Sequence, residues 1–168
     1  MDAMHAILTR RSIRKYSSEP VSDEMITELL KAAMSAPTAG NQPWHYVVIR
    51  ERNLLDSVST FHPHAEMLKQ APVGIAVCGD PTVERLKGRW LLDCAAATEN
   101  MLIAANALGL GAVWVGIYPV EERIEGLRNL LGIPSHVIPL SIVSVGNAAE
   151  KKEPPDRFKP ERIHYDRW

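Results

Sequence analysis

Apolar residues recur at helical spacing in three stretches of the chain. These stretches are residues 25–34, 89–108 and 121–131, where apolar side chains return every three or four positions. Ser22 precedes two acidic residues and can cap the first helix, whereas a glycine follows directly after each of the other two. Apolar spacing over residues 4–13 predicts a further, shorter helix that runs into a cluster of basic residues.

Runs rich in apolar, β-branched and aromatic residues predict four β-strands, at residues 44–49, 73–79, 112–117 and 137–145. The run at residues 73–79 contains no polar residue, so this strand is expected to be buried on both faces. Because helices and strands are interspersed and no repeat or linker divides the chain, we expect a single domain with an α+β or α/β layered fold.

The last segment, residues 151–168, differs from the rest of the chain. It is polar, contains three prolines and shows no periodicity. A segment of this kind lies over another surface or is disordered, and its Tyr165 and Trp168 favour docking. We refer to residues 151–168 below as the tail.

Composition agrees with a globular domain and excludes several classes of protein. The chain has 168 residues, of which 46% are hydrophobic, enough to form a core without disulfides or metals. The formal net charge of −1 argues against general nucleic-acid binding. The charge is unevenly distributed, however: residues 1–20 carry four basic and two acidic residues, and the tail carries six and four. Both ends are therefore net positive and the centre is net negative.

The sequence also indicates the cellular compartment of the protein. Cys78 and Cys94 both lie in apolar runs and are expected to be buried free thiols in a reducing compartment. The first ten residues lack the pattern of a signal peptide, and no stretch of about 18 residues is free of charge. We therefore expect a cytoplasmic protein without a membrane span.

Two motifs favour ordinary structural roles. Residues 109–114 superficially resemble a dinucleotide fingerprint, but they follow a helix and open a strand, the reverse of the required context. A helix stop and tight turn is the better interpretation. His62 and His64 have a spacing that can bind a metal, yet no further cluster completes such a site, so a surface turn is favoured and no metal is expected.

Two other segments carry candidate chemistry. Arg10, Arg11, Ser12 and Arg14 place three guanidinium groups and a hydroxyl within five residues, a set that suits phosphate but also occurs on solvated basic faces. Residues 37–44 form an amide-rich loop between two prolines. Its amide side chains pair with donors and acceptors on a planar heterocycle such as a pyrimidine ring edge, although a simple helix-to-strand turn explains the composition equally well.

Taken together, these segments resemble the nitroreductase-like family of FMN-dependent oxidoreductases. The match runs in order through RRSIRKY at 10–16, APTAGNQPWH at 36–45, DCAAATENML at 93–102, GLGAVWVGIYP at 109–119, PDRF at 155–158 and HYDRW at 164–168. No single motif is decisive, but their order over nearly the whole chain is specific.

The resemblance implies an α+β, three-layer fold over residues 1–168. A central mixed, mainly antiparallel sheet would be flanked by helices, in an obligate homodimer with two FMN molecules at its interface and the tail packed on the dimer. The implied cofactor-binding residues are Arg10, Arg11, Ser12, Arg14, Pro37, Thr38, Asn41, Gln42, Trp114, Val115, Gly116 and Arg157.

Roles for these residues also follow from the resemblance. Arg10, Ser12 and Arg157 would hold the phosphate and ribityl chain, and Arg14 would approach the pyrimidine edge. Residues 114–116 would lie along the isoalloxazine. Pro37, Thr38 and Asn41 would come from the partner subunit. The family loop usually has one residue between Asn and Gln-Pro-Trp, whereas here Asn41 directly precedes Gln42, so Gly40 or Gln42 are alternatives for the place of Asn41.

The implied activity is hydride transfer from NADH or NADPH through FMN to small electrophilic acceptors, such as nitroaromatics or quinones, by a ping-pong mechanism. The flavin carries this chemistry, so no catalytic side chain is expected. Two alternatives are a non-catalytic flavin-binding or storage module and a dimeric helical scaffold that binds no cofactor.

Overall fold

Four strands form one antiparallel sheet in the computed structural model, which describes residues 1–168. In the order in which they lie side by side, the strands are β1 (Trp44–Ile49), β2 (Val73–Gly79), β4 (Ile138–Gly146) and β3 (Gly111–Gly116). Every neighbouring pair is antiparallel, and a parallel link occurs only as an isolated bridge between Ser12 and Ala112. The expected mixed sheet is thus antiparallel throughout its four strands.

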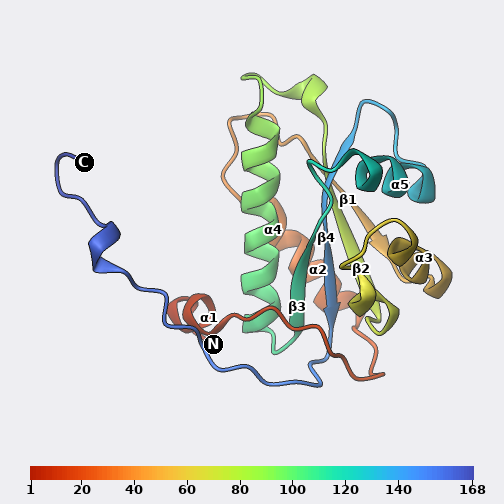
Figure 1. Ribbon diagram of the computed structural model, residues 1–168, viewed down its shortest axis with the longest axis horizontal. Helices are drawn as coiled ribbons and strands as arrows, with labels where there is room; N and C mark the ends of the chain where they lie inside the picture. Colours follow the sequence, from red (N-terminus) through yellow and green to blue (C-terminus); the bar gives the residue numbers. More distant parts are fainter.

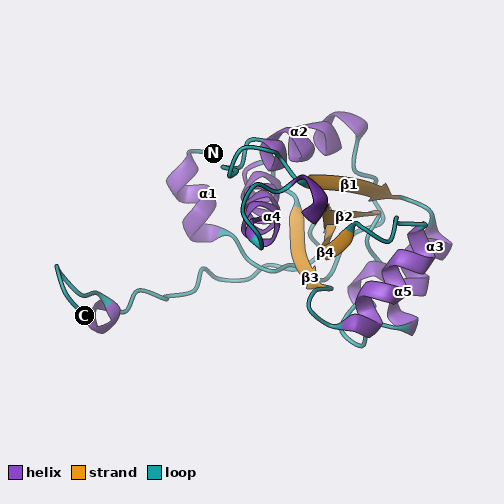
Figure 2. Ribbon diagram, turned by 90° about the horizontal axis from the view of Figure 1, so that it is seen from above, coloured by secondary structure: helices purple, strands orange, loops and turns teal.

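Helices cover both faces of this sheet. They are α1 (Ala3–Thr9), α2 (Asp23–Met34), α3 (Arg52–Ser57), α4 (Arg89–Ala107) and α5 (Glu121–Leu131). Helices α2 and α4 lie on one face and α3 and α5 on the other (Figure 1, Figure 2). The structure therefore confirms the three-layer α+β fold.

Each face of the sheet has its own hydrophobic core. Between the sheet and α4, Cys94, Ala97 and Met101 are fully buried, and the small side chains let the helix approach the sheet closely. On the other face, Leu55 of α3 and Leu127 of α5 are fully buried. Strand β2 lies inside the sheet with both faces covered, which confirms its expected complete burial.

Helix α4 separates two segments that matter for the site. It contains 19 residues and is therefore about 28 Å long. At its first turns, the Ala39 N–H donates to the Asp93 carboxylate at 3.3 Å. Near its last turn, the Asn106 amide donates to the Ala6 carbonyl at 2.9 Å. The amide-rich loop and the start of the basic cluster thus lie at opposite ends of the same helix (Figure 1).

Some expected elements differ from the structure. The first helix ends at Thr9, so Ile13 lies outside it, and Leu8 is 63% exposed. The helix stops there because the following residues lie along β3. Helix α3 and two short 3-10 turns, at residues 58–60 and 66–69, were not predicted, since each is too short to show a helical period.

The tail leaves the body of the molecule (Figure 1). It contains one short 3-10 turn, Pro160–Arg162, and its Tyr165 is 83% exposed. Trp168 is fully exposed. The two aromatics therefore do not dock on their own chain, and docking on a second chain stays a prediction.

The prediction of buried free cysteines is confirmed. Cys78 and Cys94 are free and buried, and burial raises the pKa of each thiol to about 12, which keeps both protonated and unreactive. No helix has the length and apolar character needed to span a bilayer.

Candidate functional site

The basic segment, residues 10–14, lies beside the outer edge of strand β3. The Ile13 N–H donates to the Ala112 carbonyl at 3.0 Å, which fixes the segment against the strand. Gly111 permits this approach, since a Cβ atom there would lie 2.6 Å from Cγ2 of Ile13. Ile13 is buried as a result, and the polar residues around it remain at the surface.

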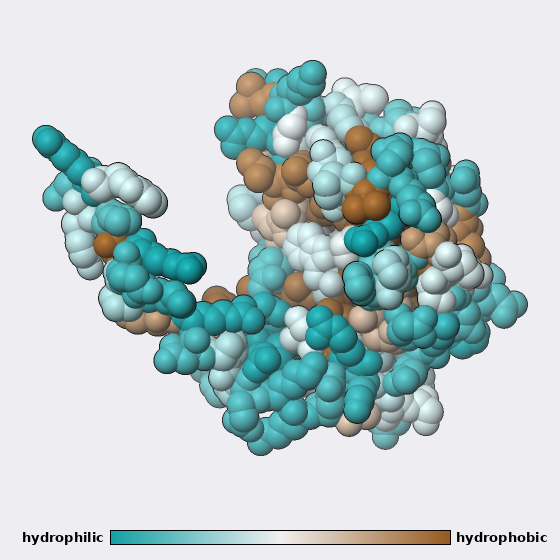
Figure 3. Space-filling model, viewed as in Figure 1, coloured by the Kyte–Doolittle hydropathy of each residue, from teal (hydrophilic) through white to brown (hydrophobic).

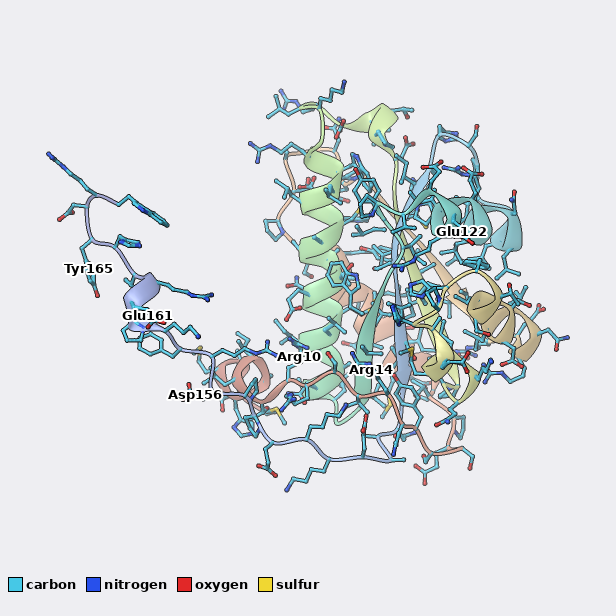
Figure 4. The ribbon with its side chains drawn as sticks, viewed as in Figure 1. Arg10, Arg14, Glu122, Asp156, Glu161 and Tyr165 are labelled. Carbon is cyan, nitrogen blue, oxygen red and sulfur yellow. The ribbon has the colours of Figure 1, made fainter.

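A cavity of about 290 Å³ opens over this segment and has no hydrophobic residue in its lining. It is lined by Arg10, Arg11, Ser12, Arg14, Lys152 and Arg157. We call this cavity the anion pocket. The structure thus brings Arg157 of the tail to the predicted arginines of the N-terminal segment, at the end of α4 where Arg10 and Arg14 lie (Figure 4).

Lys152 is a member of this pocket that the sequence analysis missed. Its ammonium group donates to the Ser12 carbonyl at 2.7 Å and lies 3.0 Å from the Glu150 carboxylate. The available signal was the basic pair at the start of the tail, Lys151 and Lys152. That pair alone does not show which lysine faces the arginines.

The charges of the anion pocket are only partly compensated. The Arg10 guanidinium pairs with the Glu99 carboxylate at 3.0 Å. The Glu150 carboxylate accepts a hydrogen bond from the backbone N–H of Arg14 at 2.6 Å. This hydrogen bond and the nearby Lys152 hold the pKa of Glu150 below its ordinary value, so the group stays ionised at neutral pH. Five cationic side chains face two carboxylates, leaving a net charge of +3 that suits a doubly charged phosphate group.

Strand β3 provides a second feature, an edge with free backbone groups. It pairs only with β4, and the Ala112 carbonyl points away from that partner toward Ile13. Because backbone groups alternate in direction along a strand, those of Trp114 and Gly116 point to the same outer edge. Two of the predicted cofactor-binding residues therefore present peptide groups at a position where a flat ring could bind.

The Gly116 carbonyl on this edge has two side-chain partners. His62 Nε2 lies 2.7 Å from it, and the Arg123 guanidinium donates to it at 3.2 Å. His62 is only 3% exposed, so the expected surface turn is wrong for this residue, whereas His64 is exposed. No group of three or more metal-ligating side chains occurs in the structure.

The amide-rich loop forms a separate hollow at the opposite end of α4. Thr38 Oγ1 accepts the Gly40 N–H at 2.8 Å, and Asn41 donates to the Val83 carbonyl. The hollow is lined by Pro37, Thr38, Ala39, Arg89, Leu92, Asp93 and Ala96. Neither Asn41 nor Gln42 lines it, and both side chains lie away from the anion pocket along the same chain.

The predicted residues thus form two groups in one chain. The basic segment, Arg157 and the β3 edge form one group, whereas the loop with Pro37, Thr38, Asn41 and Gln42 lies at the first turns of α4. The anion pocket contains no residue of the second group.

Comparison with known proteins gives one consistent result. A sequence model of the nitroreductase family matches residues 7–62 and 60–147. A relative from Methanothermobacter thermautotrophicus, provisionally named NADH dehydrogenase/NAD(P)H nitroreductase, is 48% identical over 169 residues, covering 100% of this chain and 88% of the relative.

Solved structures agree with this result. A crystal structure from Parabacteroides distasonis under the same provisional name has a TM-score of 0.95 and 39% identity, with 99% of this chain and 98% of that chain covered. A Desulfovibrio desulfuricans protein, provisionally called a nitroreductase and solved in complex with FMN, has a TM-score of 0.85 and 30% identity. The match covers 100% of this chain and 98% of the Desulfovibrio chain.

Proposed function

The chain belongs to the nitroreductase family of oxidoreductases, and from this we propose that it binds FMN between two copies of itself and passes hydride from NAD(P)H to small electrophilic acceptors. The observation that carries the proposal is the anion pocket, which is lined entirely by polar residues and adjoins a free strand edge. The FMN complex of the Desulfovibrio relative supports the choice of cofactor.

The residues of the anion pocket fit the phosphate end of FMN. Guanidinium groups bind phosphate oxygens in pairs, and a serine hydroxyl adds a neutral hydrogen bond. Arg10, Ser12 and Arg157 would hold the phosphate, with Arg11 and Lys152 adding positive charge. Because Arg157 belongs to the tail, bound phosphate would also hold the part of the tail around Arg157 beside the anion pocket.

The edge of β3 fits the ring end of the same cofactor. The outward N–H groups of Trp114 and Gly116 are donors without a strand partner, and a flavin ring edge carries acceptor atoms. Val115 faces the core and is nearly completely buried, so it supports the strand. Bound FMN would supply the hydride chemistry, and Arg14 would stabilise the negative charge of the reduced ring.

A second copy of the chain would complete the site. The loop with Pro37 and Thr38 lies at the first turns of α4 and the anion pocket lies toward the other end, so two α4 helices packed antiparallel would bring one chain's loop to the other's pocket. Leu92 of α4 and Met4 of α1 are exposed, at 56% and 61%. Hydrophobic residues also reach the surface over the upper part of α4 (Figure 3). Covering them in a homodimer would be favourable.

The acceptor class follows from the chemistry of the proposed cofactor. Because bound flavin would supply the hydride chemistry, the selectivity of the reaction would come from the shape of the space above the ring. Reductant and acceptor would use this space in turn, which is a ping-pong mechanism. Nitroaromatics and quinones are flat electrophiles of suitable size.

Anaerobic stopped-flow measurements test this proposal. The protein is saturated with FMN, mixed with NADH or NADPH, and then with a nitroaromatic or a quinone. We expect loss of the flavin's visible absorbance with at least one nicotinamide and its return with the acceptor. Binding of FMN without bleaching would instead indicate a storage module, and failure to bind FMN would refute the proposed cofactor.

A further inference from the structure

A buried histidine adjoins the strand edge to which the ring has been assigned. His62 Nδ1 accepts the His64 N–H at 3.1 Å, so this nitrogen carries no proton. The proton of the neutral ring is therefore on Nε2, which donates to the Gly116 carbonyl at 2.7 Å. Burial lowers the pKa of His62, and this keeps the ring neutral at physiological pH.

Helix α5 fixes the position of this histidine. A Cβ atom at Gly126 would lie 2.5 Å from the ring of Phe61, so Phe61 packs directly on the helix where its glycine leaves room. Arg123 lies one helical turn before Gly126 and donates to the same Gly116 carbonyl. The turn with His62, 54 positions before Gly116, and the first part of α5, seven positions after it, thus meet at one peptide oxygen.

We infer that His62, together with Arg123, is a positioning residue that sets the Gly116 peptide toward the cofactor ring. This inference rests on the proposed function, because it assigns the ring to the β3 edge. Gly116 ends an edge strand and has no side chain to restrict its backbone. Its carbonyl belongs to the Gly116–Ile117 peptide, whose N–H donates to the Leu140 carbonyl of β4 at 3.0 Å. His62 and Arg123 hold the other side of this peptide, and with it fixed the rotation of Gly116 that would turn its own N–H, in the preceding peptide, away from the outer edge is restricted.

The same two donors alter the electrostatics of that edge. A bare carbonyl oxygen would repel the acceptor atoms and the growing negative charge of a reduced ring. With His62 and Arg123 on the oxygen, its partial charge is offset and the guanidinium adds a positive charge. The pair should therefore favour binding of FMN and raise its reduction potential.

Substitution at residue 62 tests the inference. His62→Leu removes the Nε2–H donor at similar volume, whereas His62→Gln keeps an N–H donor. His64→Leu is the matched control, because His64 is exposed and its hydrogen bond to His62 comes from its backbone, so the substitution removes only the edge of a ring whose centroid lies 6.3 Å from that of His62. The measurements are the FMN dissociation constant, the reduction potential of bound FMN, and the visible spectrum.

We expect His62→Leu to raise the FMN dissociation constant about tenfold, the effect of one lost hydrogen bond, and to make the potential more negative. The Gln variant and the His64→Leu control should stay near wild type. An unchanged potential and dissociation constant in a folded Leu variant would overturn the inference.

Arg123→Met provides a second variant for the case in which His62→Leu fails to fold, since Arg123 is only half-buried. It should shift the potential in the same direction, and a wild-type potential would overturn the inference. Failure of the proposed function gives a different result, because the wild-type chain itself would then bind no FMN.

Discussion

The ammonium group of Lys152 donates a hydrogen bond to the backbone carbonyl of Ser12 at 2.7 Å, across 140 positions of the sequence. With the hydrogen bond from the Arg14 N–H to Glu150, it joins the start of the tail to the basic segment. The positive charge at the two ends of the chain therefore acts in one place, the anion pocket.

Arg10→Ala should weaken FMN binding about 10- to 100-fold, because one charge-assisted hydrogen bond to the phosphate is lost. Titration of FMN fluorescence measures the change. Arg50→Ala is the matched control, since Arg50 is an exposed arginine paired with Asp23 away from the pocket. Equal binding by the Arg10 variant and wild type would remove Arg10 from the phosphate site.

Arg14→Ala should lower the reduction potential of bound FMN and slow turnover while part of the FMN remains bound. The reason is the loss of a positive charge that stabilises the reduced ring. A redox titration with reference dyes measures the potential, and Arg14→Lys, which keeps the charge, should fall between the two. The assigned role would be wrong if the potential of the Ala variant equalled that of wild type.

Leu92→Glu should produce a monomer that also fails to retain FMN. The side chain is 56% exposed on α4 beside the loop with Pro37, where we place the contact between two copies. Sedimentation gives the oligomeric state and absorbance gives the FMN content. Val48→Glu, which alters a 38% exposed side chain on β1, should remain dimeric. A dimeric, FMN-loaded Leu92 variant would contradict this arrangement.

Gly111→Ala should destabilise the fold by about 1–3 kcal/mol and weaken FMN binding, because the new methyl group would push Ile13 and the basic segment away from β3. Urea unfolding and FMN titration measure the two effects. Gly109→Ala is the contrast: its φ of +80° makes it strained, but no atom lies within 4 Å of the added Cβ. It should lose about 1 kcal/mol of stability and bind FMN normally.

The cofactor-free protein should lose stability as the pH falls from about 7 to 5.5. His62 has an ordinary pKa of 6.5, which burial lowers in the folded state. Below pH 6.5 the unfolded chain binds a proton that the folded chain resists, so acid favours unfolding in this window. Urea unfolding at several pH values should show a smaller slope for His62→Gln, and identical slopes would contradict a buried neutral His62.

Much of the fold could be predicted because its signals are local. The strands at residues 44–49 and 73–79 and the helix at 121–131 agree with the structure, since period and capping depend on neighbours a few positions away. Helix α3 was missed because six residues are too few to show a period. His62 was misjudged because its burial depends on Phe61 packing against Gly126 of a distant helix.

The features of the candidate site also fall into those that local sequence predicts and those that depend on the tertiary structure. The sequence by itself determined the chemistry, three guanidinium groups and a hydroxyl at one end and Arg157 at the other, and through the order of its motifs it identified the family. Only the tertiary structure decided that these ends meet, that Lys152 joins them, and that the loop with Pro37 lies outside the pocket, at the first turns of α4. The physical reason is that such contacts depend on the order β1-β2-β4-β3 and on the length of α4, which no short window of residues contains.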